Sequence, residues 1–231
     1  MIEDKFGDLS VFDEIYATSY WGMGSGGGST IKAALPYKKF LERFLRDHEI
    51  KSIVDLGCGD WQFSRFIDFA YASYKGFDVA NTVVRENQKN FASDTVSFEC
   101  FKNYEVLPPA DLLVCKDVLQ HLSNDEVKKA LSILPRYKFA LITNDITGMS
   151  RLGELLWKLR HSSSAQLINR EINIGDYRPL DPTKEPFGIN AKKVLQWKIN
   201  KFGTTRRFSK NSLVYGITSE WTKRTYLHIS C

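Results

Sequence analysis

The stretch Ile53-Val-Asp-Leu-Gly-Cys-Gly-Asp60 decides the fold that this sequence predicts. Its apolar first half has the composition of a buried strand, and two glycines, Gly57 and Gly59, follow at the strand's carboxyl end. Glycines at that place let the backbone turn tightly and let a ligand come close, and open α/β sheets bind ligands at the carboxyl ends of their strands. The stretch therefore predicts a strand, a ligand-binding turn and a helix over residues 63–70.

The ligand expected at this turn is neither a dinucleotide nor a nucleoside triphosphate. Gln62 stands where the fingerprint G-x-G-x-x-G has its third glycine, and the Gly-Lys-Ser/Thr of a P-loop does not follow. Asp55, two residues before the first glycine, suits a cationic ligand better than a pyrophosphate. Asp78 ends the next strand, where a carboxylate can bind the two hydroxyls of a ribose, although an aspartate at a strand end is common in any fold.

Strand-like and helix-like segments alternate along the chain, which predicts an α/β fold. Helices are expected over residues 9–17, 32–47, 63–70, 82–91 and 123–134, and residues 151–160 have the pattern of one more. Strands are expected over residues 52–56, 74–79, 96–100, 112–115 and 139–143, then over 194–199, 213–218 and 225–229. Five strand–helix units followed by a strand-rich end predict a doubly wound, mainly parallel sheet with helices on both faces and an antiparallel C-terminal hairpin.

The bulk properties are those of one globular domain over residues 1–231, with 43% hydrophobic and 26% charged residues. The N-terminus has no apolar leader, and no apolar run approaches the roughly 20 residues of a membrane span. The four cysteines form no C-x-x-C pair, so we expect buried free thiols rather than a disulfide or zinc site, and a cytoplasmic location.

The net charge of +5 is concentrated at the C-terminus. Residues 188–231 contain nine Lys or Arg against Glu220 alone, so this tail carries +8 and the preceding chain −3. Such a tail suits an anionic partner such as RNA, a phosphorylated glycan carrier or a membrane surface. Alternatively, it forms a solvated face on edge strands, where lysine discourages aggregation.

Three parts of the sequence resemble class I S-adenosylmethionine-dependent methyltransferases. The turn at residues 55–59, Asp78 and the stretch Asp111-Leu-Leu-Val-Cys-Lys-Asp-Val-Leu-Gln-His-Leu122 are similar to the first, second and fourth motifs of that family. Five further stretches are similar to a bacterial and viral branch whose members can accompany glycosyltransferases: residues 21–29, 61–63, 143–145, 177–181 and 186–188. The resemblance implies a Rossmann-like fold with a seven-stranded, mainly parallel sheet. It also implies S-adenosylmethionine as methyl donor with S-adenosylhomocysteine as product, and a glycosyltransferase as partner or fused domain.

The resemblance also implies which residues bind the cofactor. Its methionine part is expected over the glycine turn and its ribose on Asp78, with further contacts from Asp55, Gly57, Gly59, Asp60, Trp61, Val79, Lys116 and Asp117. Many relatives have an aspartate after the third strand that binds the adenine amino group. This chain has Phe101, Lys102 and Asn103 there, so Phe101 is expected to pack on the adenine and the polar contact stays open.

The glycine-rich residues 22–29 are expected to close over the methionine end of the cofactor as a lid that excludes water, with Tyr20, Trp21, Gly24 and Ser25. A flexible linker is the alternative interpretation of the same composition.

Methyl transfer to a hydroxyl needs an in-line approach to the sulfonium methyl group and a base that takes the proton. His121 is the best candidate base, because it follows the fourth strand and its ordinary pKa suits neutral pH, although it could merely pack against the cofactor. Asp117 and Asp145 are further catalytic candidates, and Asp145 could also bind a divalent metal ion, which nothing else in the sequence indicates. The candidate acceptor-binding residues, of the types that a polyhydroxylated sugar requires, are Asn144, Asp145, Tyr177 and Arg178.

We therefore expect an S-adenosylmethionine-dependent O-methyltransferase that acts on a sugar hydroxyl of a glycan or glycoconjugate. One alternative is an RNA or protein methyltransferase, disfavoured because Lys116-Asp117-Val118-Leu119 replaces the Asn/Asp-Pro-Pro-aromatic motif of amino-methylating nucleic-acid enzymes. The other is a non-catalytic binding module, against which the intact turn, Asp78 and His121 argue. Within the domain we assign residues 1–50 to N-terminal helices and lid, 51–145 to the cofactor-binding core, 146–190 to an acceptor-site insertion and 191–231 to C-terminal strands.

Overall fold

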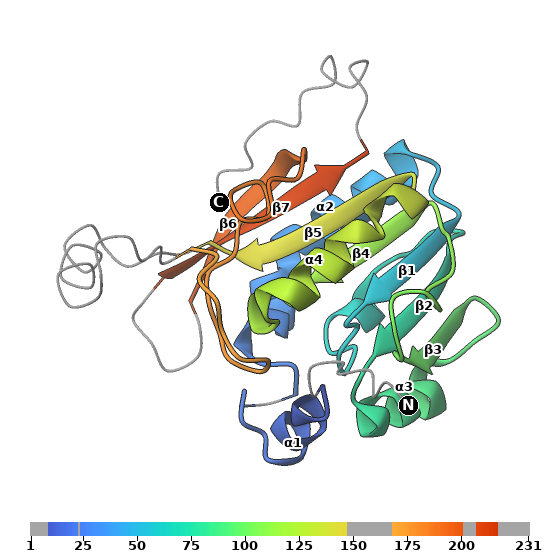
Figure 1. The fold of residues 1–231 in the computed structure, drawn as a ribbon. Coiled ribbons are helices and arrows are strands. Elements are labelled where there is room, and N and C mark those ends of the chain that lie inside the picture. The colour runs from blue at the N-terminus through green and yellow to red at the C-terminus, as the bar shows by residue number, and fades with distance from the viewer. Residues whose placement is uncertain (1–8, 23, 147–167, 201–206, 217–231) are drawn as a thin grey trace, which may run out of the picture.

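The computed structural model describes residues 9–22, 24–146, 168–200 and 207–216. In this part of the chain seven strands form one sheet in the order β3-β2-β1-β4-β5-β7-β6 (Figure 1). Their bounds are β1 Ser52–Leu56, β2 Ser73–Asp78, β3 Val96–Cys100, β4 Leu112–Lys116, β5 Phe139–Asp145, β6 Lys192–Asn200 and β7 Arg207–Tyr215. β7 is antiparallel to β5 and β6, and the other neighbouring strands are parallel. The predicted sheet and its antiparallel C-terminal hairpin are confirmed.

The strand order reverses between β1 and β4. β2 and β3 extend the sheet on one side of this point, and β4 and β5 extend it on the other. Every residue of β4 and β5 is buried, as expected of strands that are covered on both faces. Such a reversal leaves a crevice at the carboxyl ends of the strands, which is the ligand-binding place of open α/β sheets.

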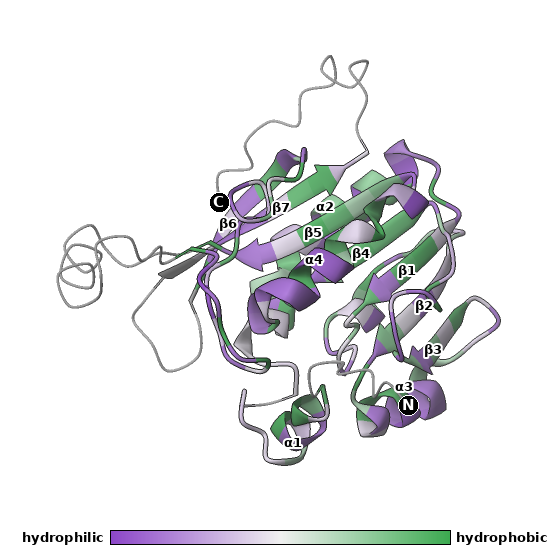
Figure 2. Cartoon of the chain, viewed as in Figure 1, coloured by the Kyte–Doolittle hydropathy of each residue, from purple (hydrophilic) through white to green (hydrophobic). Residues whose placement is uncertain are grey.

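Helices cover both faces of the sheet, as predicted. They are α1 Val11–Ala17, α2 Ile31–Asp47, α3 Asn81–Phe91 and α4 Asn124–Ser132, with short 3-10 turns η1 Gly27–Ser29, η2 Ser64–Phe66, η3 Leu119–His121 and η4 Leu134–Arg136. The apolar stripe of α2 packs with Ile53, Leu112 and Leu141 on one face, and α4 packs with Leu113 and Ile142 on the other. Figure 2 shows the resulting apolar strands between helices whose outward residues are hydrophilic.

The helix predicted over residues 63–70 is wrong. Only the 3-10 turn η2 forms there, and extended chain follows it. The carboxylate of Asp68 accepts the N–H of Ala70 at 2.9 Å, and the carboxylate of Glu42 accepts the N–H of Asp68 at 2.8 Å. Side chains therefore satisfy backbone groups that a helix would have used.

Other differences are smaller. β7 begins six residues before the strand predicted at 213–218, because its first half is polar and does not have the apolar composition of a strand. The helix predicted at 151–160 and the strand predicted at 225–229 lie outside the described residues. Cys58 and Cys115 are free and buried, whereas Cys100 is a free thiol that is only half-buried.

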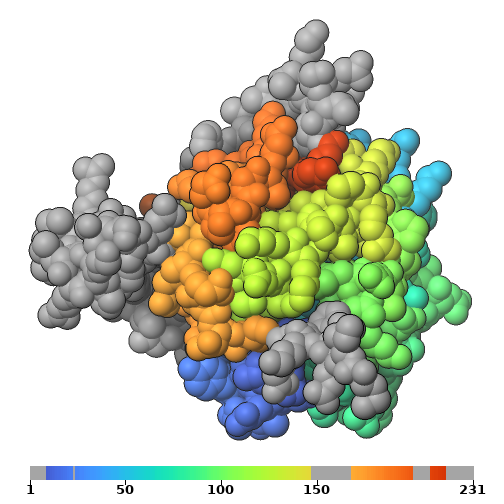
Figure 3. Space-filling model, in the orientation of Figure 1, coloured from blue at the N-terminus to red at the C-terminus, as the bar shows by residue number. Residues whose placement is uncertain are grey.

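Residues 168–190, here called the strap, cross the carboxyl edge of the sheet without a helix or strand. Backbone N–H groups of the strap donate to the segment after β4 and to β5: Gly175 to the carbonyl of His121 at 2.9 Å, and Leu180 to the carbonyl of Asp145 at 2.9 Å. Figure 3 shows the strap (orange) beside α4 and above α1. The strap therefore forms one wall of the crevice.

Candidate active site

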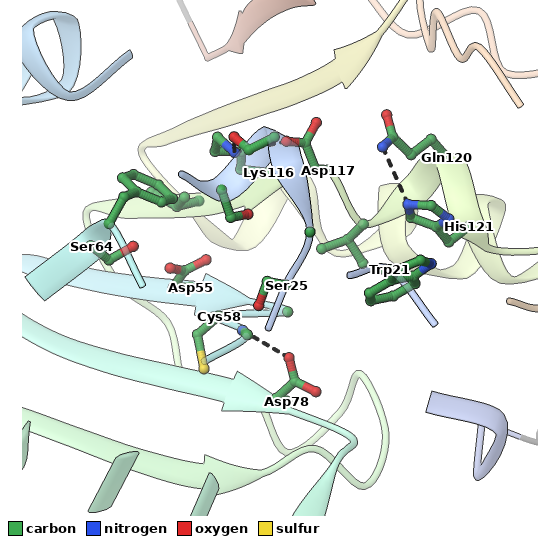
Figure 4. A pocket seen from close by; sticks show the side chains of 18 of the residues that line it. Trp21, Ser25, Asp55, Cys58, Ser64, Asp78, Lys116, Asp117, Gln120 and His121 are labelled. Atoms are coloured by element: carbon green, nitrogen blue, oxygen red, sulfur yellow. Dashed lines mark hydrogen bonds and ion pairs between the residues drawn. The ribbon is translucent and has the colours of Figure 1, made fainter. Parts of the chain in front are cut away.

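A cavity of about 370 Å³ lies at the point where the strand order reverses (Figure 4). Its walls come from α1, from residues 20–29 (the lid), from the glycine turn, from residues 116–121 after β4, from the strap and from Lys210 of β7. Segments that are far apart in the sequence thus enclose one space at the carboxyl ends of β1, β2 and β4.

The glycine turn is held by backbone hydrogen bonds and by close packing. The N–H groups of Gly57 and Cys58 donate to the carbonyl of Phe77 at 2.7 and 3.0 Å. Gly57 has a φ of +77°, and a Cβ there would lie 2.3 Å from a methyl group of Val118. Only glycine fits without strain, because L side chains disfavour this backbone conformation and the space is filled.

Asp78 ties the turn to the end of β2. Its carboxylate accepts the N–H of Gly59 at 2.9 Å and the N–H of Ala80 at 3.0 Å. Burial raises the pKa of Asp78, and these backbone hydrogen bonds oppose the rise. The carboxylate borders the cavity, where its remaining lone pairs could accept ligand hydroxyls.

The floor of the cavity consists of Asp55, Tyr37, Phe63 and Tyr74. The Tyr74 hydroxyl donates to the carboxylate of Asp55 at 2.6 Å. Burial raises the pKa of Asp55 to about 7, although the Tyr74 hydrogen bond and the Lys116 ammonium favour the ionised form. The Tyr37 hydroxyl is buried and has no hydrogen-bond partner among the described residues. The floor is therefore aromatic, with one carboxyl group that titrates near neutral pH.

Lys116, Asp117 and Lys210 form a second buried group, here called the ion triad. The Lys116 ammonium donates to the Asp117 carboxylate at 2.7 Å, and the Lys210 ammonium donates to the other carboxylate oxygen. Burial would raise the pKa of Asp117, but the two ammonium groups hold it below its usual range. The Lys116 side chain also lies over the ring of Phe63, with the ammonium 4.8 Å from the ring centroid.

The lid is fixed to the glycine turn through one serine. The Ser25 hydroxyl donates to the Asp60 carboxylate at 2.7 Å, accepts the Asp60 N–H at 3.0 Å and lies 2.9 Å from the Tyr16 hydroxyl. Further along the lid, the carbonyl of Gly28 accepts from the Lys116 ammonium at 3.3 Å. In this structure the lid is therefore closed over both the glycine turn and the ion triad.

His121 lies between the lid and the strap. Its ring is 4.9 Å from the ring of Trp21 and 5.9 Å from the ring of Tyr177, measured between centroids. Its Nδ1 is 2.9 Å from the carbonyl oxygen of Asp176, and its Nε2 is 3.3 Å from the amide nitrogen of Gln120. The imidazole thus borders the cavity with both ring nitrogens in hydrogen-bond contact.

The structure brings ten of the predicted site residues to the cavity: Trp21, Ser25, Asp55, Gly57, Gly59, Asp78, Lys116, Asp117, His121 and Tyr177. Two more, Gly24 and Asp60, contact each other where the lid meets the turn, since a Cβ on Gly24 would overlap the Asp60 carboxylate. The roles of all these residues stay predictions.

The other predicted site residues do not line the cavity. Trp61 packs against Phe69, Tyr74 and Phe98 in the core, and Phe101 packs against Tyr104 on the opposite face of the sheet. Val79 is packed against the same core as Phe101, and Lys102 is exposed. Trp61 and Phe101 are both large aromatic side chains that are buried in the core.

The predicted acceptor-binding residues are placed in two ways. Tyr177 faces the cavity, whereas Asn144, Asp145 and Arg178 are buried away from it. The guanidinium of Arg178 donates to the carbonyl of Leu122 at 2.6 Å and to the side chain of Asn124 at 3.1 Å. Arg178 therefore joins the strap to the start of α4.

The sequence did not single out Lys210, Gln120, Tyr16 or Tyr37. Lys210 was counted in the basic tail, but it is only 1% exposed. The signal was the alternation Lys210, Ser212, Val214 along β7, which places the lysine on the same buried face as a core valine.

No protein-family model matches the sequence, and no curated protein matches it. The chain is similar in structure to magnesium protoporphyrin IX methyltransferase from Synechocystis PCC 6803 with bound SAH, at 15% identity and a TM-score of 0.57, over 90% of this chain and 98% of that one. It is also similar to a putative sarcosine dimethylglycine methyltransferase from Galdieria sulphuraria, at 12% identity and a TM-score of 0.51, over 81% of this chain and 76% of that one. This chain has the Rossmann-like fold of class I S-adenosylmethionine-dependent methyltransferases.

The described residues contain no cluster of three or more His, Cys, Asp or Glu side chains placed to hold a metal ion. Their helices are too short or too polar to cross a bilayer.

Proposed function

We propose that this protein is an S-adenosylmethionine-dependent methyltransferase that methylates a hydroxyl group. The observation that carries the proposal is that the glycine turn, Asp78 and His121 border one cavity at the reversal point of the sheet. Each feature alone is common, but the three together supply a close-approach turn, a carboxylate for ribose hydroxyls and a base.

The charges around the cavity support a cationic ligand. Its lining contains four aspartates, Asp55, Asp78, Asp117 and Asp176, and two lysines, Lys116 and Lys210. Carboxylates in excess of ammonium groups favour a ligand with net positive charge, such as a sulfonium with an amino-acid end. Tyr16, Trp21 and Tyr177 supply aromatic faces, which attract cations and exclude water.

His121 is the residue that we propose as the general base. Bound S-adenosylmethionine would supply an electrophilic methyl group, whose C–S bond breaks as the acceptor oxygen bonds to the carbon. His121 takes the proton of the acceptor hydroxyl on Nε2, so the ring becomes an imidazolium and later releases the proton to water. Asp117 is held ionised by two lysines, which makes it an acceptor of hydrogen bonds rather than a proton carrier.

For the acceptor we propose a sugar hydroxyl of a glycan or glycoconjugate. Tyr20 and Tyr177 border the cavity, and the ring of Tyr177 lies beside that of His121; aromatic faces of this kind pack against the C–H face of a sugar ring. Tyr20 is also 75% exposed, so it could contact a part of the acceptor that extends outside. A glycosyltransferase as partner and a cytoplasmic location are part of the same proposal.

Two measurements, made one after the other, test the proposal. Calorimetric titration with S-adenosylmethionine should give saturable binding, and no binding at millimolar ligand would overturn the assignment of cofactor. Transfer of a radiolabelled methyl group to a panel of deoxysugar glycans, RNAs and proteins, with and without a chelator, should label the glycans.

The variant His121→Ala sharpens the test of mechanism. We expect it to bind S-adenosylmethionine normally and to lose about 10²- to 10⁴-fold in transfer rate, the usual contribution of a general base. Full activity of His121→Ala would show that another group takes the proton.

A further inference from the structure

We infer that Gln120 is a positioning residue that holds His121 in the neutral tautomer with the proton on Nδ1 and the lone pair on Nε2. That this tautomer serves catalysis rests on the proposed function. The tautomer itself follows from three hydrogen bonds, whatever the function is. Gln120 is 3% exposed, so its amide group has few orientations available.

The orientation of the Gln120 amide is fixed by a backbone group of β5. The N–H of Asp145 donates to Oε1 of Gln120 at 2.8 Å. A backbone N–H cannot donate to an NH2 group, so the oxygen must occupy that side of the amide. The NH2 group is thereby turned toward the imidazole (Figure 4), with its nitrogen 3.3 Å from Nε2 of His121.

The protonation of the two ring nitrogens follows from their partners. An amide NH2 group only donates, so Nε2 must accept and carries no proton. On the other side of the ring, Nδ1 lies 2.9 Å from the carbonyl oxygen of Asp176, which only accepts, so Nδ1 must carry the proton. Both contacts thus select the same neutral tautomer, whose Nε2 lone pair is the one that a base needs.

Protonation of His121 would turn one of these contacts into a repulsive one. An imidazolium places an N–H on Nε2, directly against the NH2 group of Gln120. Gln120 therefore favours the neutral ring before the acceptor arrives. The acceptor hydroxyl then takes the Nε2 lone pair in place of the Gln120 NH2 group, which moves off Nε2 when the acceptor binds.

Other charged groups near the ring do not reverse this selection. The titratable groups that line the cavity with His121 are Asp55, Asp78, Asp117, Asp176, Lys116, Lys210, Cys58 and the tyrosines Tyr16, Tyr20, Tyr37, Tyr74 and Tyr177. The carboxyl groups of Asp55 and Asp78 accept hydrogen bonds from the Tyr74 hydroxyl and from backbone N–H groups, respectively. Asp117 is paired with both lysines. Asp176 contacts the ring through its carbonyl.

Nitrogen-15 NMR of the imidazole rings in the uniformly labelled full chain tests the inference without any acceptor. The spectrum of His121→Gln identifies the His121 signals by their loss. We expect, at pH 8, a protonated Nδ1 and an unprotonated Nε2. A proton on Nε2 in the wild-type protein would overturn the inference, whether or not the protein proves to be a methyltransferase.

The variant Gln120→Glu tests whether Gln120 controls the protonation of His121. A carboxylate keeps the acceptor for the Asp145 N–H and places a second acceptor against Nε2, so it should favour the imidazolium. We expect the NMR titration midpoint of His121 to move upward by about 1 pH unit or more. An unchanged midpoint would mean that Gln120 does not control the ring.

Gln88→Glu is the matched control. Gln88 also accepts a backbone N–H through Oε1, that of Phe98 at 3.0 Å, but it lies on α3 and does not line the cavity. The same change of charge there should leave the His121 midpoint where it is. An equal shift in both variants would show that net charge, and not the contact with Nε2, is responsible.

Discussion

The floor of the cavity and the ion triad each contain a buried aspartate, but their surroundings shift the two pKa values in opposite directions. Asp55 in the floor has a neutral hydroxyl as its direct partner, and burial raises its pKa to about 7. Asp117 in the triad is paired with two ammonium groups, and its pKa is held below the usual range in spite of burial. Burial alone therefore does not decide the charge of a carboxyl group here, since the charge of its nearest partner does.

The two regions also differ in how they are assembled. The floor is built between the neighbouring strands β1 and β2, where Asp55 and Tyr74 are 19 residues apart. The triad joins residues 93 positions apart, on β7 and just after β4. A floor with a carboxyl group that titrates near neutral pH and a wall whose aspartate stays ionised thus face the same cavity, and changing the charge of each should have different consequences.

The largest effect is expected for Asp117→Asn. Asparagine has nearly the same size and tolerates the φ of +61° at this position, so the change mainly removes the negative charge. Two buried ammonium groups would then have no counter-ion within the triad. We expect a loss of about 3–5 kcal/mol in the free energy of unfolding, measured by urea denaturation at pH 7.

Lys210→Met is the matched variant, because it leaves a balanced pair of Lys116 and Asp117. Its loss should be clearly smaller than that of Asp117→Asn, and equal losses would contradict the description of the triad as a charge balance. The wild-type protein should also begin to lose this stabilisation as the pH falls below about 3.9, the ordinary pKa of aspartate, and should go on losing it until the pH has passed the lower folded-state pKa of Asp117.

An intermediate effect is expected for Gly57→Ala. Gly57 lies in the glycine turn above the floor and packs against Val118, the residue after Asp117. The new Cβ would adopt a disfavoured backbone conformation and would lie 2.3 Å from a methyl group of Val118. We expect a loss of about 1–3 kcal/mol in urea denaturation, together with weaker binding of S-adenosylmethionine.

Gly22→Ala separates the backbone strain from the steric overlap with Val118. Gly22 also has a positive φ, +90°, but nothing lies within 4 Å of the position of its Cβ. A smaller loss than in Gly57→Ala would measure the backbone strain alone. If both variants lose the same free energy, the contact with Val118 has no energetic importance.

At pH 7 the smallest loss of stability is expected for Asp55→Asn, whose main effect is a change in pH dependence. The folded-state pKa of Asp55, about 7, lies above the ordinary value near 3.9, so the folded protein binds the proton more tightly. The wild-type free energy of unfolding should therefore fall as the pH rises from about 4 to 7. Asp55→Asn should show a shallower fall over that window in urea titrations, and an unchanged slope would exclude Asp55 as its source.

The local sequence was enough to predict those parts of the site that lie directly after a strand. The glycine turn, Asp78 and the segment around His121 each follow directly from a strand, and parallel strands place their carboxyl ends at one edge. The resemblance to methyltransferases also led us to expect Phe101 on the adenine, which stays a prediction; in the structure the Phe101 ring packs against Tyr104 in the core. The pattern of one short segment does not reveal which core will take an aromatic side chain.

Apolar periodicity and turns that need glycine were enough to predict the parallel sheet, its antiparallel end and the place of the cavity. The charges and protonation states within the cavity could be read only from the folded protein. Lys210 reaches Asp117 from a distant strand, and Asp145 orients Gln120 against His121. Charge and hydrogen bonding act over a few ångströms, and in this protein the groups within that distance come from segments that only the completed fold brings together.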